Sequence, residues 1–434
     1  MSRGRRAQLV VIGNGMAGMR AVEELIARAP DRFDIAVIGA EPHPNYNRIL
    51  LSAVLAGEKT LDEIVVNPHA WYAEHGICLM TGSRAVAIDR AARTVALADG
   101  ASLPYDKLLL ATGSKPLAPP IPGLGFENVR AFRDIADAQA MIAAARGGGR
   151  AVVIGGGLLG LEAAWGLKRR GMAVALVHLM PTLMERQLDV AAGELLRRAL
   201  EARGIVFFIN SQTEEIVGDD RAEAVLLADG RRLPADFVVL AVGIRPNIDL
   251  ARAADLDVNR GILVGDDMAT SDPDIYAVGE CIEHNGQVFG LIAPIWDQAR
   301  VCGARLAGDA DAAYVPPPVF TSLKITGIDV FSAGRLAAAD TADEEITLHD
   351  EKGGLYKKVI LREDRVVGSV LYGSVADGPW YVELMGARAD VSSIRDQIVF
   401  GRAFAEQAKA VPRADIAPTP VSEAGTAAGW WQAA

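Results

Sequence analysis

Two glycine-rich segments with the same spacing stand far apart in this chain of 434 residues. Each follows the pattern Gly-x-Gly-x-x-Gly, and the glycines are Gly13, Gly15 and Gly18 in the first and Gly155, Gly157 and Gly160 in the second. In such a turn the first glycine permits a tight bend and the second lets the backbone approach a pyrophosphate. The third lets the following helix pack closely on the strand, and the helix N-terminus favours anions. Two such turns predict two bound dinucleotides, and therefore electron transfer between them.

A strand and a helix must flank each turn if it is to hold a nucleotide. Residues 9–12 are an apolar run that predicts a buried strand, and residues 19–29 predict a helix. The second unit occupies about residues 149–242, with further strands at 173–178 and 237–242. The same order of elements in both places predicts two related Rossmann-like units.

The end of the second strand in each unit is where an acid would accept hydrogen bonds from a ribose. In the first unit this strand is predicted at residues 34–39, and Glu41 is the candidate acid, directly after Ala40. Arg48, in a loop that leads into a helix, could reach a phosphate or the ring system of the cofactor. An ordinary surface charge is an equally good interpretation of Arg48. In the second unit the position carries His178, with neither an acid nor an arginine pair beside it.

Further strand ends carry residues that could lie against a cofactor. The strand predicted at residues 106–111 ends in Ala111-Thr112-Gly113, and Gly243 follows the last strand of the second unit in a similar way. An ordinary strand-to-loop turn is the alternative for both. Similar strand ends in both units are expected if the two units are related.

A later strand and helix point back to the first unit. Residues 272–281 predict a strand that ends in Gly279-Glu280, and Glu280 is either a cofactor contact or a capping acid. Residues 294–306 predict a helix with Ile295 in its first turn. Its N-terminal amides would stabilise negative charge on a reduced cofactor.

Composition excludes several classes of function. The net charge of −11 argues against nucleic acid or an anionic membrane as the main partner. No uncharged apolar stretch reaches the ~20 residues that a membrane span needs. The three cysteines form no disulfide framework, so a cytoplasmic location is expected. Cys281 and His284 are spaced like half of a metal site, but without a second pair we predict no bound metal.

The remainder of the chain suggests a further domain. Residues 320–335 and 344–371 alternate apolar and polar residues and predict an antiparallel sheet, and residues 380–404 predict helices. We expect a first nucleotide unit from residues 1–115 and 247–314, and a second nucleotide unit at 116–246. An α+β interface domain at 315–410 and a mobile tail at 411–434 complete the prediction. The sheet is a candidate docking surface for a partner, and a homodimer interface is an equally good interpretation.

At this point the chain resembles the FAD- and NAD(P)H-dependent pyridine nucleotide reductases. It is most similar to the flavin-bearing half of bacterial NAD(P)H nitrite reductase large subunits, over about residues 7–405. The segments that carry the resemblance are the two glycine turns, Ala111-Thr112-Gly113, Leu183-Met184-Glu185-Arg186, Gly243-Ile244-Arg245-Pro246, Tyr276-Ala277-Val278-Gly279-Glu280 and Val288-Phe289-Gly290-Leu291-Ile292-Ala293-Pro294. The resemblance implies an α/β fold with two dinucleotide-binding domains of the FAD/NAD(P)-binding reductase type and a C-terminal α+β domain.

The resemblance also implies site residues. The expected FAD-binding residues are Gly13, Gly15, Met16, Ala17, Gly18, Glu41, Arg48, Val86, Ala111, Thr112, Gly113, Glu280 and Ile295. The expected NAD(P)H-binding residues are Gly155, Gly157, Leu158, Leu159, Gly160, His178 and Gly243. No side chain is expected to act as a catalytic acid, base or nucleophile, because the flavin carries the chemistry.

Three positions depart from the family pattern. Ala40 stands where an acid usually ends the second FAD strand, and Ala53 replaces a lysine that related ferredoxin reductases carry. His178 replaces the acid that marks NADH use. Residues 49–61 hold no cysteine, whereas disulfide reductases of this superfamily carry a reactive cysteine pair there.

The expected function is hydride transfer from NADH, or NADPH, to FAD, followed by electron transfer to a partner redox protein. An assimilatory nitrite or nitrate reductase is the first expectation for the partner, because full nitrite reductase subunits continue into iron–sulfur and sirohaem modules and this chain would serve as the electron-input part. An NADH:rubredoxin or ferredoxin reductase is the alternative enzyme, with a small iron protein as acceptor. A redox-sensing protein that binds FAD and NADH but turns over slowly is the alternative from another class.

Overall fold

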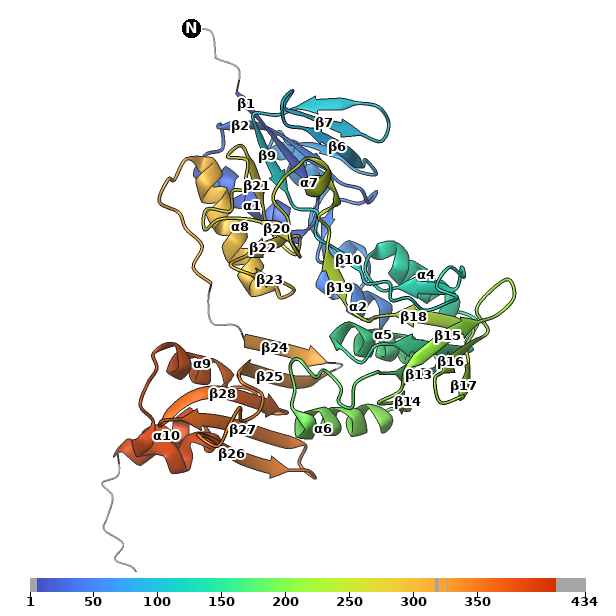
Figure 1. Ribbon diagram of the computed structural model, residues 1–434, viewed down its shortest axis with the longest axis vertical. Helices are drawn as coiled ribbons and strands as arrows, with labels where there is room; N and C mark the ends of the chain where they lie inside the picture. Colours follow the sequence, from blue (N-terminus) through green and yellow to red (C-terminus); the bar gives the residue numbers. More distant parts are fainter. Residues whose placement is uncertain (1–5, 317–319, 326, 411–434) are drawn as a thin grey trace, which may run out of the picture.

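The computed structural model describes residues 6–316, 320–325 and 327–410. Figure 1 shows three regions in succession: a first nucleotide-type unit at the top, a second at the right, and a C-terminal sheet with its helices at the bottom. The predicted α/β fold with a C-terminal α+β domain is confirmed. The tail predicted at 411–434 lies outside the described residues.

The first unit is built on a parallel sheet of five strands around β1. Its order is β21 (Ile275–Ala277), β9 (Lys107–Leu110), β1 (Ala7–Ile12), β2 (Phe33–Ile38) and β5 (Cys78–Met80). The apolar residues 9–12 are buried because both neighbours of β1 and the helices cover them. Helix α1 (Met16–Arg28) packs against α8 (Ile292–Ala307), as Figure 1 shows. Strand β21 therefore brings residues near 280 to the same sheet edge as the first glycine turn.

The second unit repeats this plan with its own parallel sheet. Its order is β11 (Val129–Ala131), β18 (Phe237–Leu240), β12 (Arg150–Ile154), β13 (Ala173–Val177) and β14 (Ile205–Phe208). Its helices are α4 (Ile135–Ala145), α5 (Leu158–Arg169) and α6 (Val190–Glu201). Strand β12 is central, like β1, so the second glycine turn also leaves from the middle of a parallel sheet.

Short strands connect the two units, and further short strands and helices are attached to each of them. The chain crosses between them through β10 (Ser114–Pro116) and β19 (Ile244–Pro246), which pair antiparallel. Each unit also carries one small antiparallel sheet of three strands. In the first unit the strands are β6 (Ala85–Asp89), β7 (Thr94–Leu97) and β8 (Ser102–Pro104). In the second unit they are β15 (Thr213–Val217), β16 (Ala224–Leu227) and β17 (Arg232–Pro234). The remaining elements of these units are β3 (Asn45–Tyr46), η1 (Arg48–Leu50), α2 (Leu51–Leu55), η2 (Asp62–Ile64), β4 (Val65–Asn67), α3 (His69–Glu74), α7 (Asp249–Ala253), β20 (Ile262–Leu263), β22 (Ile282–His284) and β23 (Gln287–Val288).

Helix α2 belongs to the first unit in sequence but packs on the second. It contacts α4 and α5, and Figure 1 shows it among their ribbons. Leu51, Val54 and Leu55 share one apolar cluster with Ala164 and Leu167 of α5. A bulkier residue at Gly166 would collide with Leu55, since an added Cβ would lie 2.6 Å from its Cγ. The two units are therefore joined by a close helix contact as well as by the paired strands.

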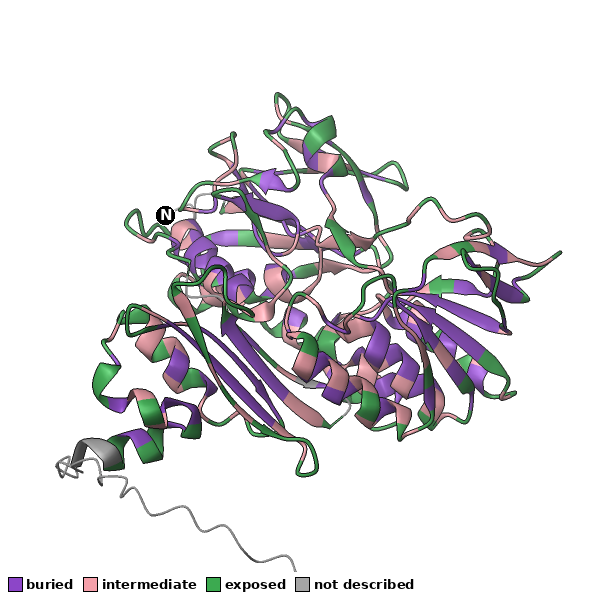
Figure 2. Cartoon of the chain, turned by 60° about the horizontal axis from the view of Figure 1, so that its bottom comes forward, coloured by how far each residue is buried: buried purple, intermediate pink, exposed green. Residues whose placement is uncertain are grey.

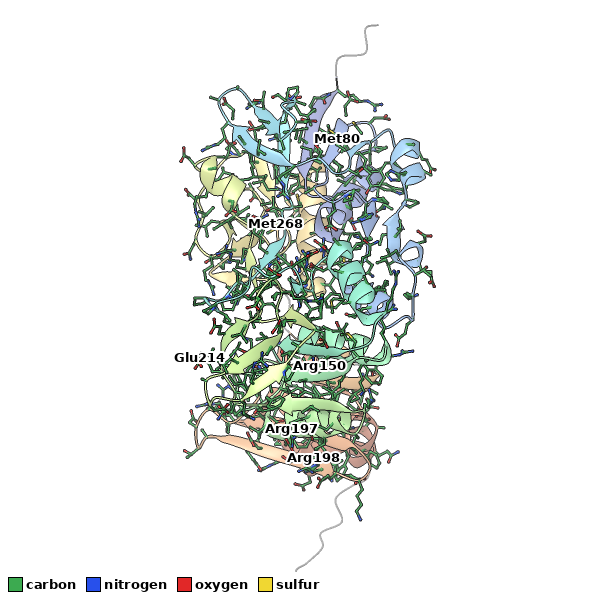
Figure 3. All side chains as sticks on the ribbon, turned by 90° about the vertical axis from the view of Figure 1, so that its right-hand side faces the viewer. Met80, Arg150, Arg197, Arg198, Glu214 and Met268 are labelled. Carbon is green, nitrogen blue, oxygen red and sulfur yellow. The ribbon has the colours of Figure 1, made fainter. Side chains whose placement is uncertain are left out.

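The C-terminal region is an antiparallel sheet with helices on one face. Its order is β24 (Phe320–Ile325), β25 (Ile328–Gly334), β28 (Arg365–Tyr372), β27 (Leu355–Arg362) and β26 (Asp343–Asp350), followed by α9 (Gly378–Gly386), η3 (Ser392–Phe400) and α10 (Arg402–Ala410). Its tie to the second unit is partly polar. Lys358 Nζ lies 2.6 Å from Asp189 Oδ2, and the Tyr356 hydroxyl donates to the same oxygen at 2.6 Å. Asp189 also caps α6, and Figure 3 shows Arg197 and Arg198 of α6 on the side next to this sheet.

The alternating pattern of this sheet does not mark an open surface. Val330 and Val370 pack toward the second unit, whereas Phe331 and Leu371 pack toward α9 and η3. Figure 2 shows the central strands of this sheet as buried. The central strands are covered on both faces by the same chain, whereas the edge strand β26 is largely exposed, so a docking or dimer role of this sheet stays a prediction. Among the described helices, none is long and apolar enough to cross a bilayer.

Candidate functional site

The first glycine turn connects β1 to α1 at the carboxyl edge of the first sheet. A Cβ added to Gly13 would lie 2.1 Å from the Ala111 carbonyl oxygen, and its φ of +116° suits only glycine. Gly15 is the N-cap of α1 and makes no side-chain capping bond. A Cβ added to Gly15 would meet nothing within 4 Å. The open space over uncapped helix amides is what a bound pyrophosphate requires.

The second turn reproduces this geometry between β12 and α5. A Cβ added to Gly155 would lie 2.2 Å from the Ala241 carbonyl oxygen, and its φ is +120°. Gly157 is the uncapped N-cap of α5, again with nothing within 4 Å of an added Cβ. Leu158 and Leu159 form the first turn of α5 behind it. The described residues therefore fit a second dinucleotide as well as they fit the first.

The strand ends next to the turns lie where the chain crosses between the units. Thr112 follows β9, and its hydroxyl donates to the Asn247 carbonyl at 2.7 Å. Asn247 N–H donates to the Gly113 carbonyl at 2.9 Å. Gly243 follows β18 with a φ of +117° and open space beside it. Ala111 thus borders the first turn through its carbonyl oxygen and Ala241 borders the second, while a cofactor contact at Gly243 stays a prediction.

Glu41 and Arg48 form a pair at the same edge of the first sheet. Arg48 Nη2 lies 2.5 Å from Glu41 Oε1, and the Tyr46 hydroxyl donates to Glu41 Oε2 at 2.7 Å. Burial by itself would lower the pKa of Arg48, but Tyr46 and Glu41 hold it above its usual value. Arg48 also donates to the Arg133 carbonyl. Glu41 is therefore bonded to protein donors through both oxygens, and Arg48 is a half-buried cation rather than a free surface charge.

Glu280 is brought to the site by β21 and meets a residue that the sequence pattern does not reveal. Its Oε2 accepts from the Ser114 hydroxyl at 2.7 Å and from the Arg133 guanidinium. Both side chains of the ion pair are 19% exposed. Arg133 follows the short strand β11 and belongs to no motif, so only its position after a parallel strand could have indicated it. The site therefore holds two arginines, Arg48 and Arg133, each paired with a glutamate.

Two further predicted FAD residues lie apart from this polar cluster. Val86 is on β6 and is 49% exposed, which leaves an apolar side chain open to contact. Ile295 is buried in the first turn of α8, whose N-cap makes no side-chain bond. Behind it, Gln298 Oε1 accepts from the Gly279 N–H at 3.1 Å. The α8 N-terminus is thereby tied to the segment that carries Glu280.

The side chain of His178 packs beneath the second glycine turn and bonds to its backbone. Its Nδ1 accepts from the Gly156 N–H at 3.0 Å, and its Nε2 lies 3.1 Å from the Thr182 carbonyl and 3.2 Å from Glu185 Oε2. The side chain is buried. Since Nδ1 accepts a hydrogen bond, the ring's own N–H lies on Nε2 in the neutral tautomer. Both ring nitrogens are thus engaged within the protein, and His178 fixes the backbone that a nucleotide would approach.

The cysteines have separate surroundings. Cys78 is exposed, whereas Cys281 and Cys302 are buried, and burial raises the pKa of both buried thiols. Cys281 Sγ donates to the Val278 carbonyl, while His284 Nε2 lies 2.7 Å from Asp266 Oδ1. Within the described ranges, no group of three or more His, Cys, Asp or Glu residues is arranged to hold a metal.

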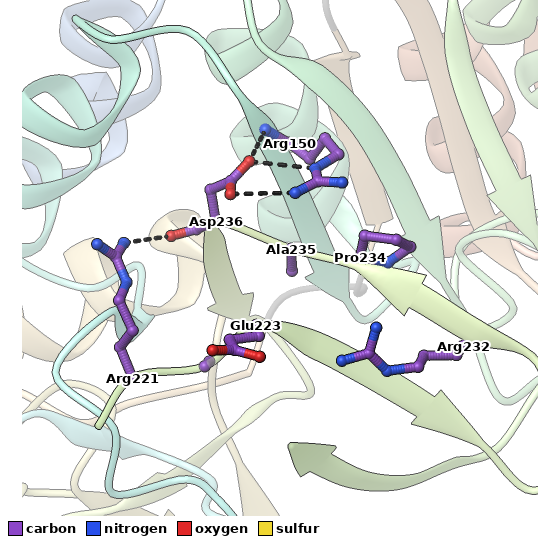
Figure 4. Close-up of a pocket in the computed structure, with 8 residues that line it drawn as sticks. Arg150, Arg221, Glu223, Arg232, Pro234, Ala235 and Asp236 are labelled. Atoms are coloured by element: carbon purple, nitrogen blue, oxygen red, sulfur yellow. Dashed lines mark hydrogen bonds and ion pairs between the residues drawn. The ribbon is translucent and has the colours of Figure 1, made fainter. Parts of the chain in front are cut away.

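Of two hollows in the structure, one lies away from the glycine turns and the other adjoins the first of them. A hollow of about 490 Å³ is lined by Arg150, Arg221 and Arg232 together with Glu223 and Asp236. Figure 4 shows Arg150 bonded to Asp236 there. Arg150 begins β12, so this hollow lies at the sheet edge opposite the second turn and is not part of the nucleotide site. A smaller hollow of about 210 Å³ borders Met16 and Trp296 and adjoins the first turn.

Comparison with known proteins agrees with this geometry. Residues 7–303 match the family described as pyridine nucleotide-disulphide oxidoreductase, and residues 318–389 match the rubredoxin NAD+ reductase C-terminal domain. The chain is 48% identical to nitrite reductase (NAD(P)H) of Bacillus subtilis (strain 168), over 89% of this chain and 48% of that protein. It is 43% identical to the assimilatory nitrate reductase electron transfer subunit of the same organism, over 91% of this chain and 51% of that protein.

A solved structure also matches nearly the whole chain. The covalent putidaredoxin reductase–putidaredoxin complex aligns with a TM-score of 0.82 at 26% identity, covering 94% of this chain and 100% of that chain. The chain spans about half the length of the two curated relatives given above.

Proposed function

The chain belongs to the pyridine nucleotide-disulphide oxidoreductase family, and we propose that it passes electrons from NADH through FAD to a partner redox protein. It is an NAD(P)H-dependent oxidoreductase, and FAD and a nicotinamide nucleotide are its cofactors. The observation that carries the proposal is the pair of matched glycine turns, each with open space over an uncapped helix. One chain that holds two dinucleotides side by side is suited to moving electrons between them.

The first set of residues binds and orients FAD. When bound, FAD supplies the two-electron to one-electron conversion that side chains do not offer. The α1 amides behind Gly15 and Met16 would hold the phosphates, and Arg48 and Arg133 add positive charge at the same edge. Glu280 keeps Arg133 in place. Further contacts to FAD would come from Val86, Ile295 and the dipole of α8. The shape of the first glycine turn depends on Ala17, Gly18 and Thr112.

The second set of residues binds the nicotinamide nucleotide. The α5 amides behind Gly157 and Leu158 would hold its phosphates, and Gly243 leaves room beside them. Gly160 lets α5 pack on β12, since a Cβ at this position would lie 2.0 Å from the Gly155 carbonyl oxygen, and Leu159 precedes it in the first turn of α5. His178 holds the backbone of the turn through Gly156. We propose that NADH is used in preference to NADPH.

The partner is proposed from the relatives and from the cysteine positions. Residues 49–61 hold no cysteine, so no dithiol stands in α2 to receive electrons. An assimilatory nitrite or nitrate reductase fits the names of the two Bacillus subtilis relatives. A rubredoxin or ferredoxin is the second candidate acceptor, favoured by the match of residues 318–389 to the rubredoxin reductase C-terminal domain.

We further propose the domain limits and location expected from the sequence. Residues 1–115 and 247–314 form the FAD domain, 116–246 the nicotinamide domain, and 315–410 the C-terminal domain. Strand β21 pairs with β9, which supports the discontinuous first domain. The cytoplasm is the proposed location because the three cysteines are free. A homodimer is an alternative assembly to a complex with a partner.

The experiment that tests the function is NADH oxidation with a set of acceptors. Purified, FAD-loaded protein is mixed with NADH and a dye, a rubredoxin, a ferredoxin, or a nitrite or nitrate reductase subunit. Fast dye reduction with selective reduction of one protein acceptor supports the proposal. Binding of both cofactors with negligible turnover on every acceptor would favour a sensing role.

A further inference from the structure

One acidic side chain at the junction of the two units has no cationic partner among the residues that the structure describes. Glu162 lies on α5, and its Oε2 accepts a hydrogen bond from the Ser52 hydroxyl of α2. The residue is partly buried among α2 and α5. Over the residues that the structure describes, Ser52 is the only hydrogen-bond partner of its carboxylate, which joins no ion pair. This distinguishes it from Glu41 and Glu280, which are paired with arginines.

Several charged groups of the neighbouring elements are occupied elsewhere. Helix α2 itself carries no charged residue. Arg170 at the end of α5 donates to the Leu55 carbonyl, and Arg169 pairs with Glu58. On α4, Asp137 accepts from backbone N–H groups of its own capping turn. Beneath α5, Arg150 of β12 pairs with Asp236 at the far edge of the sheet.

Burial, which removes water from the carboxyl of Glu162, is therefore the main influence on its pKa. Burial raises the pKa of Glu162 to about 7, and the hydrogen bond from Ser52 opposes part of that rise. A carboxyl with this pKa exchanges its proton readily at neutral pH, which is the condition for efficient proton transfer. A partly exposed position also leaves the proton a route to solvent.

The position of Glu162 relates it to both nucleotide sites. Ser52 comes four residues after Arg48 in the chain, at the first site. Glu162 comes five residues after Gly157, the N-cap of α5 at the second site. The Ser52–Glu162 bond therefore joins α2 to α5 across the contact between the two units, and in the proposed function the reacting ends of the two cofactors have to meet between these units.

The proposed reaction leaves one proton to be removed. NADH gives up a hydride, which is one proton with two electrons, and becomes NAD+. Two one-electron acceptors on the partner then take the two electrons, FAD is restored, and one proton is released. We propose that Glu162 is the group that takes up this proton and passes it to solvent, with Ser52 positioning its carboxylate. This inference rests on the proposed function.

Infrared spectroscopy tests whether Glu162 titrates near neutrality. FAD-loaded protein labelled with 13C-glutamate is titrated between about pH 5 and pH 9, and the C=O band of protonated carboxyl groups is followed. We expect a band with a midpoint near the pKa of about 7 that is absent in Glu162→Gln. Ser52→Ala should move the midpoint to higher pH, because it removes a hydrogen bond to the charged form. Glu58→Gln, an exposed residue nearby, is the matched control and should leave the band unchanged.

Stopped-flow measurements then test the transfer itself. Reduction of the flavin by NADH should stay within about twofold in Glu162→Gln, since the hydride carries its own proton. Reoxidation by ferricyanide, with proton release followed by an indicator dye, should slow about tenfold or more. The pH midpoint of that step should shift in Ser52→Ala in the same direction as the infrared band.

Two results would overturn the inference. One is a titrating band that persists in Glu162→Gln, and the other is proton release that is equally fast in this variant and in the Glu58→Gln control. Failure of the proposed function would look different, since the protein would not bind FAD or would not be reduced by NADH. The infrared titration still decides the state of Glu162 in that case.

Discussion

Gly15 and Gly157 occupy equivalent places in the two nucleotide units. Each is the N-cap of a helix in an extended conformation, and a Cβ added to either would meet nothing within 4 Å. Gly13, two residues before Gly15, differs because its added Cβ would lie 2.1 Å from a carbonyl oxygen. Side chains at Gly15 and Gly157 should therefore be compatible with folding but not with a phosphate against the backbone.

We expect Gly15→Val to abolish FAD binding and Gly157→Val to abolish reduction by NADH, with FAD retained in the second variant. The valine would fill the space that the pyrophosphate needs. Visible absorbance of the purified protein reports FAD, and thermal unfolding followed by circular dichroism checks the fold. Gly13→Val is the contrasting control and should lose stability. A yellow Gly15→Val protein that NADH reduces at the normal rate would contradict the prediction that the FAD pyrophosphate lies against Gly15.

Arg133→Ala should weaken FAD binding by about tenfold or more. The change removes a cation from the first site and leaves Glu280 without its ion-pair partner; hydrogen bonds to charged groups contribute about 1.5–3 kcal/mol. Fluorescence titration of the apoprotein with FAD measures the effect. Lys115→Ala, which removes an exposed pair with Asp249, is the control. Equal affinities in the two variants would exclude Arg133 from the site.

NADH should reduce the flavin faster, and bind more tightly, than NADPH. Glu185, held beside His178, would repel a 2′-phosphate, and no arginine pair is present to bind one. Glu185→Gln should reduce the preference for NADH over NADPH by about fivefold, corresponding to about 1 kcal/mol for a partly exposed charge. Stopped-flow reduction with both nucleotides provides the measurement. Preference for NADPH in the unmodified protein would show that Arg186 or another cation contacts the phosphate.

The cysteines should be dispensable for electron transfer. A variant with Cys78, Cys281 and Cys302 all changed to Ser should keep flavin reduction and dye reduction per bound FAD. It should be less stable, because two buried positions would receive hydroxyl groups at about 1–3 kcal/mol each. Turnover normalised to FAD content separates the two effects. A selective loss of turnover with FAD still bound would indicate a thiol mechanism.

The FAD-loaded chain should reduce ferricyanide with NADH and show no activity with nitrite or nitrate. Reduction of nitrite to ammonia takes six electrons, whereas one flavin stores two. Activity with these anions should appear when the cognate reductase subunit is added. Direct nitrite reduction by the chain alone would refute the need for a partner. Rapid reduction of a rubredoxin, with none of a nitrogen-oxide reductase, would favour the second acceptor class.

Local patterns in the sequence were sufficient for the framework. Glycine spacing and adjacent apolar runs predict strand, turn and helix because each depends on backbone geometry within a few residues. The pair Gly13 and Gly155 could therefore be placed without a structure. The alternation after residue 316 also predicted strands, but not what covers them. An apolar face looks the same in sequence whether its partner is another protein or the same chain, and only the structure shows that the central strands are covered by the chain itself.

The tertiary structure decided which side chains meet. Arg133 and Glu280 are 147 residues apart, and Ser52 and Glu162 are 110 apart, so no local pattern could pair them. His178 stood at the position of a nucleotide contact in the sequence, yet its ring bonds to Gly156. The sequence by itself determined the two nucleotide turns because their signal is short-range backbone chemistry. Charge pairing, burial and the state of Glu162 were decided only by folding, because these depend on distant segments that exclude water from one another.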